Sequence, residues 1–238
     1  MKINKIMPVL ALVLLLSVSM FGCSTATSLT SPNTVSTTMT PAAAANVQPT
    51  ETNPIVIDPV NREIRIAAKV NGTVFTQPTW HAVVYSGGKA AGASLFQAFI
   101  SPDIFYSALT YFGGSPGNNM TTTNMNNTYV QGSDISITVT WNGAPKAYNL
   151  IDVVKDPDGA NGKGIKMKFG GNLATNDSAG TGCISCFYSC PIGITSNSVY
   201  NNGDMTRQGA AGQAGFLGNQ NVLPANGTIV VLTYKVTS

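Results

Sequence analysis

Several segments of this 238-residue chain alternate apolar and polar residues with a period of two. This pattern is typical of β-strands that bury one face and expose the other. The clearest case is DISITVTW at residues 134–141, where isoleucine, valine and tryptophan alternate with acidic or hydroxylated residues. The other predicted strands lie at residues 63–70, 83–85, 95–100, 165–169 and 228–236. A chain with this many alternating segments is constrained to a β-rich fold.

One segment, residues 101–112, instead has the pattern of an amphipathic helix. Ser101 suits the position that caps a helix, Pro102 suits the first turn, and Asp103 favours the positive end of the helix dipole. Apolar residues then recur every three or four positions until Gly113. A second short helix is expected at residues 150–155. Both are predicted to pack against the sheet.

Glycine-rich and asparagine-rich stretches separate these elements and are predicted to be long loops. They lie at residues 113–127, 156–164, 170–182 and 201–221. Taken together, the patterns predict an α+β fold. We expect residues 53–238 to form one β-rich domain with a mostly antiparallel sheet and one or two short helices.

The N-terminus has the organisation of an export signal. Lys2 and Lys5 precede an apolar run at residues 7–20, which is short for a membrane-spanning helix. The run leads to Gly22-Cys23 and resembles a bacterial lipoprotein signal, in which the cysteine is lipidated and becomes the first mature residue. We therefore predict a signal peptide at residues 1–22 and a lipid on Cys23. An uncleaved anchor and an ordinary signal cleavage are the alternatives, and both place the domain outside the cytoplasm.

Residues 24–52 consist mainly of serine, threonine, alanine and proline. Such a segment buries too little apolar surface to offset the entropy lost on ordering, so it is predicted to be a flexible linker. With the lipidated Cys23 it forms the region 23–52, which as a coil would span roughly 30 Å. The predicted protein is thus a cell-envelope domain tethered to a membrane.

The charge of the chain argues against nucleic acid as a partner. The formal net charge is +3, from 13 basic and 10 acidic residues. Removing Lys2 and Lys5 with the signal leaves 11 basic residues and a net charge of +1. No stripe of lysine and arginine remains to follow a phosphate backbone. The partners we expect are the membrane and an unidentified envelope or redox protein.

Three of the four cysteines lie within eight residues, as Cys183, Cys186 and Cys190. Their spacing, C-x2-C-x3-C-P, matches the last three cysteines of a bacterial ferredoxin run. The position of the missing first cysteine holds Gly180, and no second run is present. A general secretory signal also exports the chain unfolded, which disfavours an iron–sulfur cluster inserted in the cytoplasm. A cluster with one ligand that is not cysteine remains an alternative.

A single zinc or copper(I) ion needs fewer cysteine ligands than an iron–sulfur cluster. Three thiolates and one imidazole form a tetrahedral zinc set, and copper(I) favours soft sulfur. The chain has a single histidine, His81, which is therefore the candidate fourth ligand. The metal set predicted from the sequence is Cys183, Cys186, Cys190 and His81.

A local disulfide is the structural alternative for the cysteines. Closing so short a loop stabilises by about 2 kcal/mol, whereas a structural zinc contributes on the order of 10 kcal/mol. A thioredoxin-like thiol oxidoreductase needs C-x-x-C at the start of a helix, and Pro191 and Gly193 follow too closely for one. We assign no catalytic residues, since neither a serine-nucleophile elbow nor an informative acidic pair occurs.

A set of short motifs resembles the YdjY-domain family of bacterial envelope proteins, which are often labelled ferredoxin-like. The motifs run from NPIVID at residues 53–58 through PGNN at 116–119 and FGGN at 169–172. They continue with the cysteine run and GITSN at 193–197, and with GN at 218–219 before VLP at 222–224. The resemblance covers most of residues 53–238 and implies a cysteine-bearing envelope domain, sometimes lipid-anchored. It implies no substrate or reaction.

The leading hypothesis is a lipid-anchored extracytoplasmic protein with a three-cysteine site that binds a metal or is redox-active. The rival is a non-catalytic envelope module for binding or assembly, in which the cysteines form a structural knuckle. Thiol oxidoreductase is the third alternative.

Overall fold

The structure is a computed structural model that describes residues 47–159, 162–211 and 215–237. These residues belong to the larger of two compact units, Met39–Ser238. The predicted signal peptide, Cys23 and the linker up to residue 46 lie outside the described residues. Within them, no helix combines the length and the apolar character needed to cross a bilayer.

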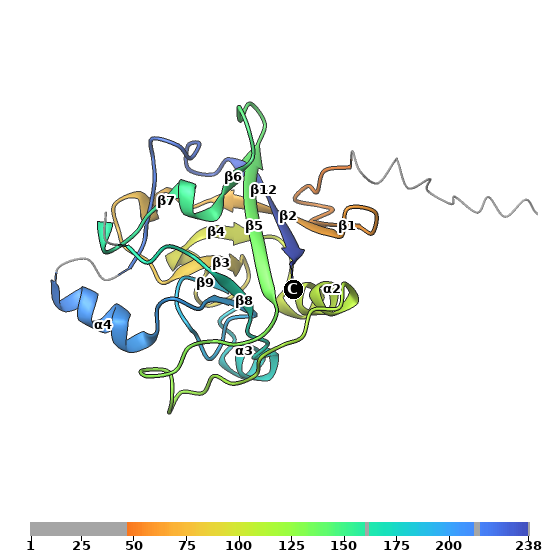
Figure 1. Cartoon of the computed structure of the whole chain (residues 1–238). Coiled ribbons are helices and arrows are strands. Elements are labelled where there is room, and N and C mark those ends of the chain that lie inside the picture. The colour runs from red at the N-terminus through yellow and green to blue at the C-terminus, as the bar shows by residue number, and fades with distance from the viewer. Residues whose placement is uncertain (1–46, 160–161, 212–214, 238) are drawn as a thin grey trace, which may run out of the picture. The chain divides into compact units, whose positions relative to one another are not determined.

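Strands dominate the described part of the chain (Figure 1). The long or central strands are β1 (Ile55–Asp58), β2 (Glu63–Val70), β3 (His81–Tyr85), β4 (Ser94–Ala98), β5 (Asp134–Trp141), β8 (Met167–Phe169), β9 (Cys183–Cys186), β10 (Thr195–Asn197) and β12 (Ile229–Val236). Short strands are β6 (Tyr148–Asn149), β7 (Val154–Lys155) and β11 (Leu217–Gly218). The helices are α2 (Pro102–Tyr111), α3 (Leu173–Ala179) and α4 (Asn202–Ala211), with 3-10 turns η1 (Gly72–Phe75), η2 (Ala91–Ala93) and η3 (Leu150–Val153).

Eight of the strands close into a barrel. Their order is β2-β12-β5-β8-β10-β9-β3-β4, and β4 pairs back onto β2. The barrel is mixed, because β3 runs parallel to β4 and β9 runs parallel to β10, whereas the other pairs in the ring are antiparallel. β1 adds to β2 outside the ring.

The predicted fold class is therefore wrong. The protein is predominantly β, with a closed mixed barrel in place of an α+β domain with a mostly antiparallel sheet. Strand alternation is a local property, and it carries no information on which strands pair or in which direction. The parallel pairs join strands that are separated by loops and turns, so the sequence holds no hairpin signal for them.

The predicted strands themselves are found, and their apolar rows form the core. Ile64, Ile66, Ala68 and Val70 of β2 are all buried. A polar contact also crosses the barrel interior. The hydroxyl groups of Ser185 on β9 and Tyr234 on β12 are hydrogen-bonded at 3.0 Å, and these strands lie four places apart in either direction around the ring.

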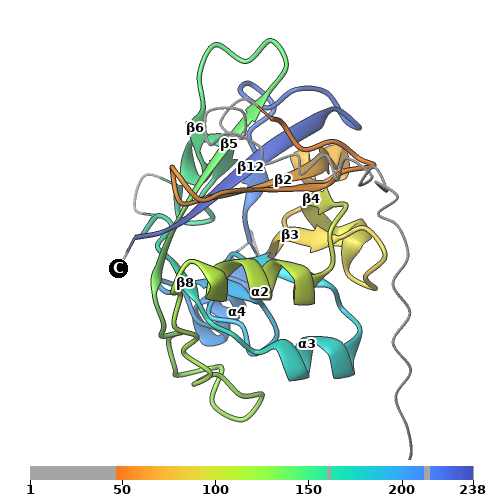
Figure 2. The ribbon, with the colours of Figure 1, turned by 90° about the vertical axis from the view of Figure 1, so that its right-hand side faces the viewer.

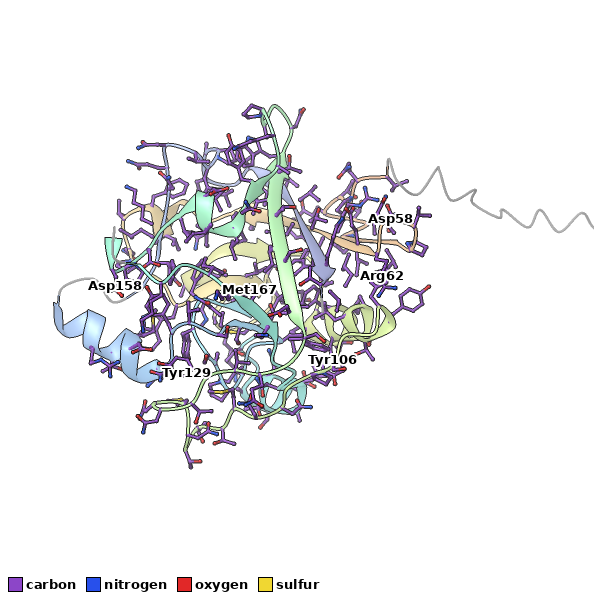
Figure 3. The ribbon with its side chains drawn as sticks, viewed as in Figure 1. Asp58, Arg62, Tyr106, Tyr129, Asp158 and Met167 are labelled. Carbon is purple, nitrogen blue, oxygen red and sulfur yellow. The ribbon has the colours of Figure 1, made fainter. Side chains whose placement is uncertain are left out.

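The predicted helix at residues 101–112 is confirmed as α2 and packs against the barrel through aromatic rings. Phe105 contacts Tyr234 of β12 edge to face, with ring centroids 4.6 Å apart. Tyr106, labelled in Figure 3, meets Phe169 of β8 at 5.1 Å in the same way. Figure 2 shows α2 lying beside α3.

Two predicted loops contain helices. α3 lies inside the segment 170–182 and α4 inside 201–221, where glycine and asparagine predicted loops. The expected second helix near residues 150–155 is a 3-10 turn followed by β7. α3 is only seven residues long and is bounded by Asn172 and Gly180, both in left-handed conformations. Its contacts with the cysteine segment, described below, explain why so short a helix forms.

Candidate metal centre

Strand pairing brings the single histidine to the cysteines. β9 begins at Cys183 and ends at Cys186, and it lies between β10 and β3. His81, the first residue of β3, is the pairing partner of Cys186. The register between β3 and β9 shifts twice near this point, so the pairing is irregular where the histidine meets the cysteines.

Three of the predicted ligands converge. One ring nitrogen of His81 and the sulfurs of Cys183 and Cys186 all lie within 4.8 Å of one another. His81 Nδ1 and Cys183 Sγ are 3.5 Å apart. These residues could hold a metal ion. The C-x-x-C pair forms a strand here and does not begin a helix as the thioredoxin-like alternative requires.

Cys190 lies on the loop between β9 and β10, next to this group but outside its 4.8 Å limit. The Cys190 and Cys186 thiols interact, since each shifts the pKa of the other. The backbone N–H of Ile192 donates to the Cys190 sulfur at 3.4 Å. Cys186 therefore stands between the other two cysteines, and all three are free thiols.

The cluster is shielded from solvent. The three cysteines are at most 2% exposed, whereas His81 is half-buried. Trp80 and Tyr188 pack edge to face beside the cluster, with ring centroids 5.3 Å apart. His81 is thus the one member of the predicted ligand set that is not fully buried.

Protonation is shared unevenly among the thiols. The hydrogen bond from Cys186 lowers the pKa of Cys183 to about 5. Burial acts in the opposite direction, whereas His81 and Thr181 lower this pKa further. Cys186 has its pKa raised well above the ordinary value, by its hydrogen bonds to the two other sulfurs and by burial. The same thiol lowers the pKa of Cys190 against the effect of burial. The thiols on either side of Cys186 therefore ionise more readily than an ordinary cysteine, and Cys186 ionises less readily.

His81 responds to the same charges. Burial lowers its pKa, but the hydrogen bond and the negative charge of Cys183, together with the charge of Cys190, outweigh burial and raise it. Buried negative charge is costly unless a cation balances it. His81 in its protonated form would supply part of that balance, and a bound metal cation would supply it in its place.

Two asparagines, Asn172 at the start of α3 and Asn176 within it, hold the cysteine segment in place. Asn176 Nδ2 donates to the carbonyl oxygens of Cys183 at 2.7 Å and Ile192 at 3.0 Å. Asn172 Nδ2 donates to those of Cys190 at 3.1 Å and Gly193 at 3.2 Å. The helix thus ties both ends of the cysteine loop, which fixes where the sulfurs lie.

The motif residues quoted above meet around this loop. Asn118 Oδ1, from PGNN, accepts a hydrogen bond from the N–H of Asn172, in FGGN, at 3.1 Å. The N–H of Gly171 donates to the carbonyl of Ile194, in GITSN, at 3.0 Å. Motifs that are far apart in sequence therefore build one support for the cysteines.

Sequence reasoning found the cysteines and His81 but missed Asn172, Asn176 and Ser196 as site residues. Ser196 is the pairing partner of Cys186 on β10 and is wholly buried. Two of these residues carry a signal, because Asn172 belongs to the motif FGGN and Ser196 to GITSN, whereas Asn176 lies in neither motif. What was lacking was the strand order that places them against the cysteines.

Comparison with known proteins agrees with these motifs. The family model described as YdjY domain matches residues 55–235. The chain is also similar to the uncharacterised protein YdjY of Escherichia coli (strain K12), with 40% identity over 183 residues, which cover 77% of this chain and 79% of that protein. No solved structure is a significant match.

Proposed function

The chain belongs to the YdjY domain family, and we propose that it is a lipid-anchored extracytoplasmic protein that binds one thiophilic metal ion, zinc or copper(I). The ligands in this proposal are Cys183, Cys186 and His81, with Cys190 as the fourth. The observation that carries the proposal is the convergence of His81, Cys183 and Cys186 within 4.8 Å.

The donor set favours a soft or borderline metal. Thiolate sulfur and imidazole nitrogen suit zinc and copper(I), whereas calcium and magnesium prefer oxygen. Cys190 supplies a third sulfur, whose interaction with Cys186 shifts the pKa of both thiols. Three cysteines and one histidine make a closed tetrahedral zinc set of the structural kind. A trigonal copper(I) site would use the sulfurs alone.

The spacing of the donors favours a single ion over an iron–sulfur cluster. The irons and sulfides of a cluster stand between its cysteine ligands and hold them apart. Donor atoms that already lie within 4.8 Å of one another leave room for one ion. The position of the absent ferredoxin cysteine, Gly180, ends α3. These points support a mononuclear site.

Elemental analysis of the full-length chain, exported and purified without chelator, tests the metal site. We expect one zinc or copper ion per chain, and a lower content in Cys183→Ser, Cys186→Ser, Cys190→Ser and His81→Ala variants. Cys23→Ala is the matched control, because it removes the cysteine that the proposal excludes from the site. A wild-type chain with no stoichiometric metal and one disulfide by mass spectrometry would instead favour the structural-knuckle alternative.

The anchor is proposed from the sequence, because Cys23 lies outside the described residues. Its support is the basic and apolar segment that ends in Gly22-Cys23. Metabolic labelling with palmitate tests it directly. We expect label in the wild-type chain and none in Cys23→Ala, which should also leave the membrane fraction. A variant that keeps both the label and the membrane association would contradict lipidation at this residue.

A further inference from the structure

A buried hydroxyl group beside the cysteine cluster lacks a hydrogen-bond partner. Ser196 on β10 is fully buried, and its Oγ has no partner in the described part of the chain. Folded proteins rarely leave buried polar atoms unpaired, because the lost hydrogen bonds to water are not replaced.

Neighbouring serines of the same segment show the ordinary situation. Ser185 Oγ bonds to the hydroxyls of Thr195 at 2.7 Å and Tyr234 at 3.0 Å. Ser189 Oγ donates to the carbonyl of Asn197 and accepts from the N–H of Val130. Ser196 therefore differs from the serines around it, because its hydroxyl is buried without a hydrogen-bond partner.

The sulfur of Cys186 borders the same space as the Ser196 hydroxyl. Ser196 and Cys186 are paired residues on the parallel strands β10 and β9. A Cβ atom at Gly193 would stand 2.8 Å from Ser196 Oγ and 2.8 Å from Cys186 Sγ. The hydroxyl and the sulfur thus border the same spot, which the missing side chain of Gly193 leaves free.

We propose that Ser196 is a positioning residue of the metal site, whose hydroxyl donates a hydrogen bond to the Cys186 thiolate when a metal is bound. This inference rests on the proposed function. A metal-bound cysteine has lost its proton, so its sulfur becomes a charged acceptor, and hydrogen bonds to charged acceptors are stronger than those between neutral groups. Groups that hydrogen-bond to metal ligands orient them and raise affinity.

Removal of the Ser196 hydroxyl should therefore have different effects on the stability of the metal-free protein and on the binding of the metal. Without metal, the Ser196 hydroxyl is buried and unpaired, so its removal should not reduce stability. With metal, the hydroxyl has a partner, so its removal should weaken binding. A serine that merely fills space would behave alike in both states.

Zinc titration of the full-length chain, against a competing chromophoric chelator, measures this difference. We expect Ser196→Ala to weaken zinc binding about tenfold, as is typical for residues that support a metal ligand. Its urea unfolding midpoint in chelator and reductant should be no lower than that of the wild type. Ser198→Ala is the control, because its hydroxyl bonds to the Lys166 carbonyl, and we expect unchanged zinc affinity.

Cobalt(II) in place of zinc gives a readout that a packing defect would not move. A thiolate that loses a hydrogen bond is a stronger electron donor, so we expect the sulfur-to-cobalt charge-transfer band of Ser196→Ala to shift to lower energy. Equal zinc affinity and an unshifted band would overturn the inference and leave the proposed metal site standing. A wild-type chain that binds none of these metals would overturn both.

Discussion

The side-chain amide of Asn176 on α3 donates to the backbone carbonyl of Cys183 on β9 at 2.7 Å. One residue of a short helix thereby fixes the first cysteine of the candidate site. The same amide nitrogen reaches the carbonyl of Ile192 at 3.0 Å, so Asn176 joins the two ends of the cysteine loop.

Asn176→Asp should destabilise the protein, because a carboxylate of the same shape cannot donate to these two carbonyls. Leaving buried acceptors unpaired costs about 1–3 kcal/mol, and the loss should appear in the free energy of unfolding measured with urea. Thr175→Ala, at the exposed preceding position on the helix, should change it by less than about 0.5 kcal/mol. Equal stability of the two variants would show that the Asn176 amide contributes little.

Gly193→Ala should damage the metal site through steric overlap. Its Cβ would lie 2.8 Å from Cys186 Sγ and 2.9 Å from the Thr195 carbonyl, closer than folded proteins allow. We expect a loss of about 1–3 kcal/mol of stability and a clearly lower zinc content by elemental analysis. Gly92→Ala is the matched control, because a Cβ there meets nothing within 4 Å. A Gly193→Ala chain with full stability and metal content would refute the close packing.

Tyr234→Phe tests the hydrogen bond that crosses the barrel. It removes the hydroxyl partner of Ser185 while keeping the ring that packs on Phe105. We expect the free energy of unfolding to fall by about 0.5–1.5 kcal/mol. Tyr111→Phe, at a side chain that is 68% exposed, should have no measurable effect. Indistinguishable unfolding curves for Tyr234→Phe and the wild type would mean that the cross-barrel bond adds no net stability.

The stability of the metal-free, reduced protein should rise with pH between about 5 and 9. The Cys183 pKa is about 5 in the folded protein, against an ordinary value of 9.0. A folded-state pKa below the unfolded one gives stabilisation that is complete above the unfolded value and is lost as the pH falls through the folded value. The slope can reach about 1.4 kcal/mol per pH unit for one proton.

His81 opposes this trend in part. Its pKa is raised, so the stabilisation that it contributes is present below about pH 6.5 and is lost as the pH rises through its folded value. Cys183→Ser removes the first effect and reduces the second, since the Cys183 sulfur also raises the His81 pKa through its hydrogen bond and its charge. Urea unfolding at a series of pH values should therefore give a flatter dependence for this variant. A wild-type stability that falls over the whole range would contradict the lowered Cys183 pKa.

Local structure could be predicted from the sequence where one residue pattern decides it. The alternation in residues 134–141 predicted β5, and Pro102 with the following apolar stripe predicted α2. The helices α3 and α4 could not be predicted this way, because Asn172 and Gly180 are loop-forming residues by composition. In the structure they bound α3, and contacts with the cysteine loop stabilise it.

The candidate metal ligands could be proposed from the sequence, but the residues that position them could not. Three clustered cysteines and a single histidine are apparent in the sequence as candidate ligands, and the structure brings His81 close to Cys183 and Cys186. Ser196 lies near Cys186 only because β10 runs parallel to β9. Parallel pairing depends on the closure of the whole barrel, so no short stretch of sequence contains that neighbour relation.

The closing strand of the ring is also the last in the sequence. β12 pairs with both β2 and β5, so the seven ring strands that precede it form an open sheet until residues 229–236 join. The barrel therefore cannot close around its interior until residues 229–236 have been made. A chain that ends before Ile229 would lack the strand opposite β9, including the Tyr234 hydroxyl that reaches Ser185. The thiols of such an unfinished chain would meet oxidants and metals without the enclosure that the complete fold provides.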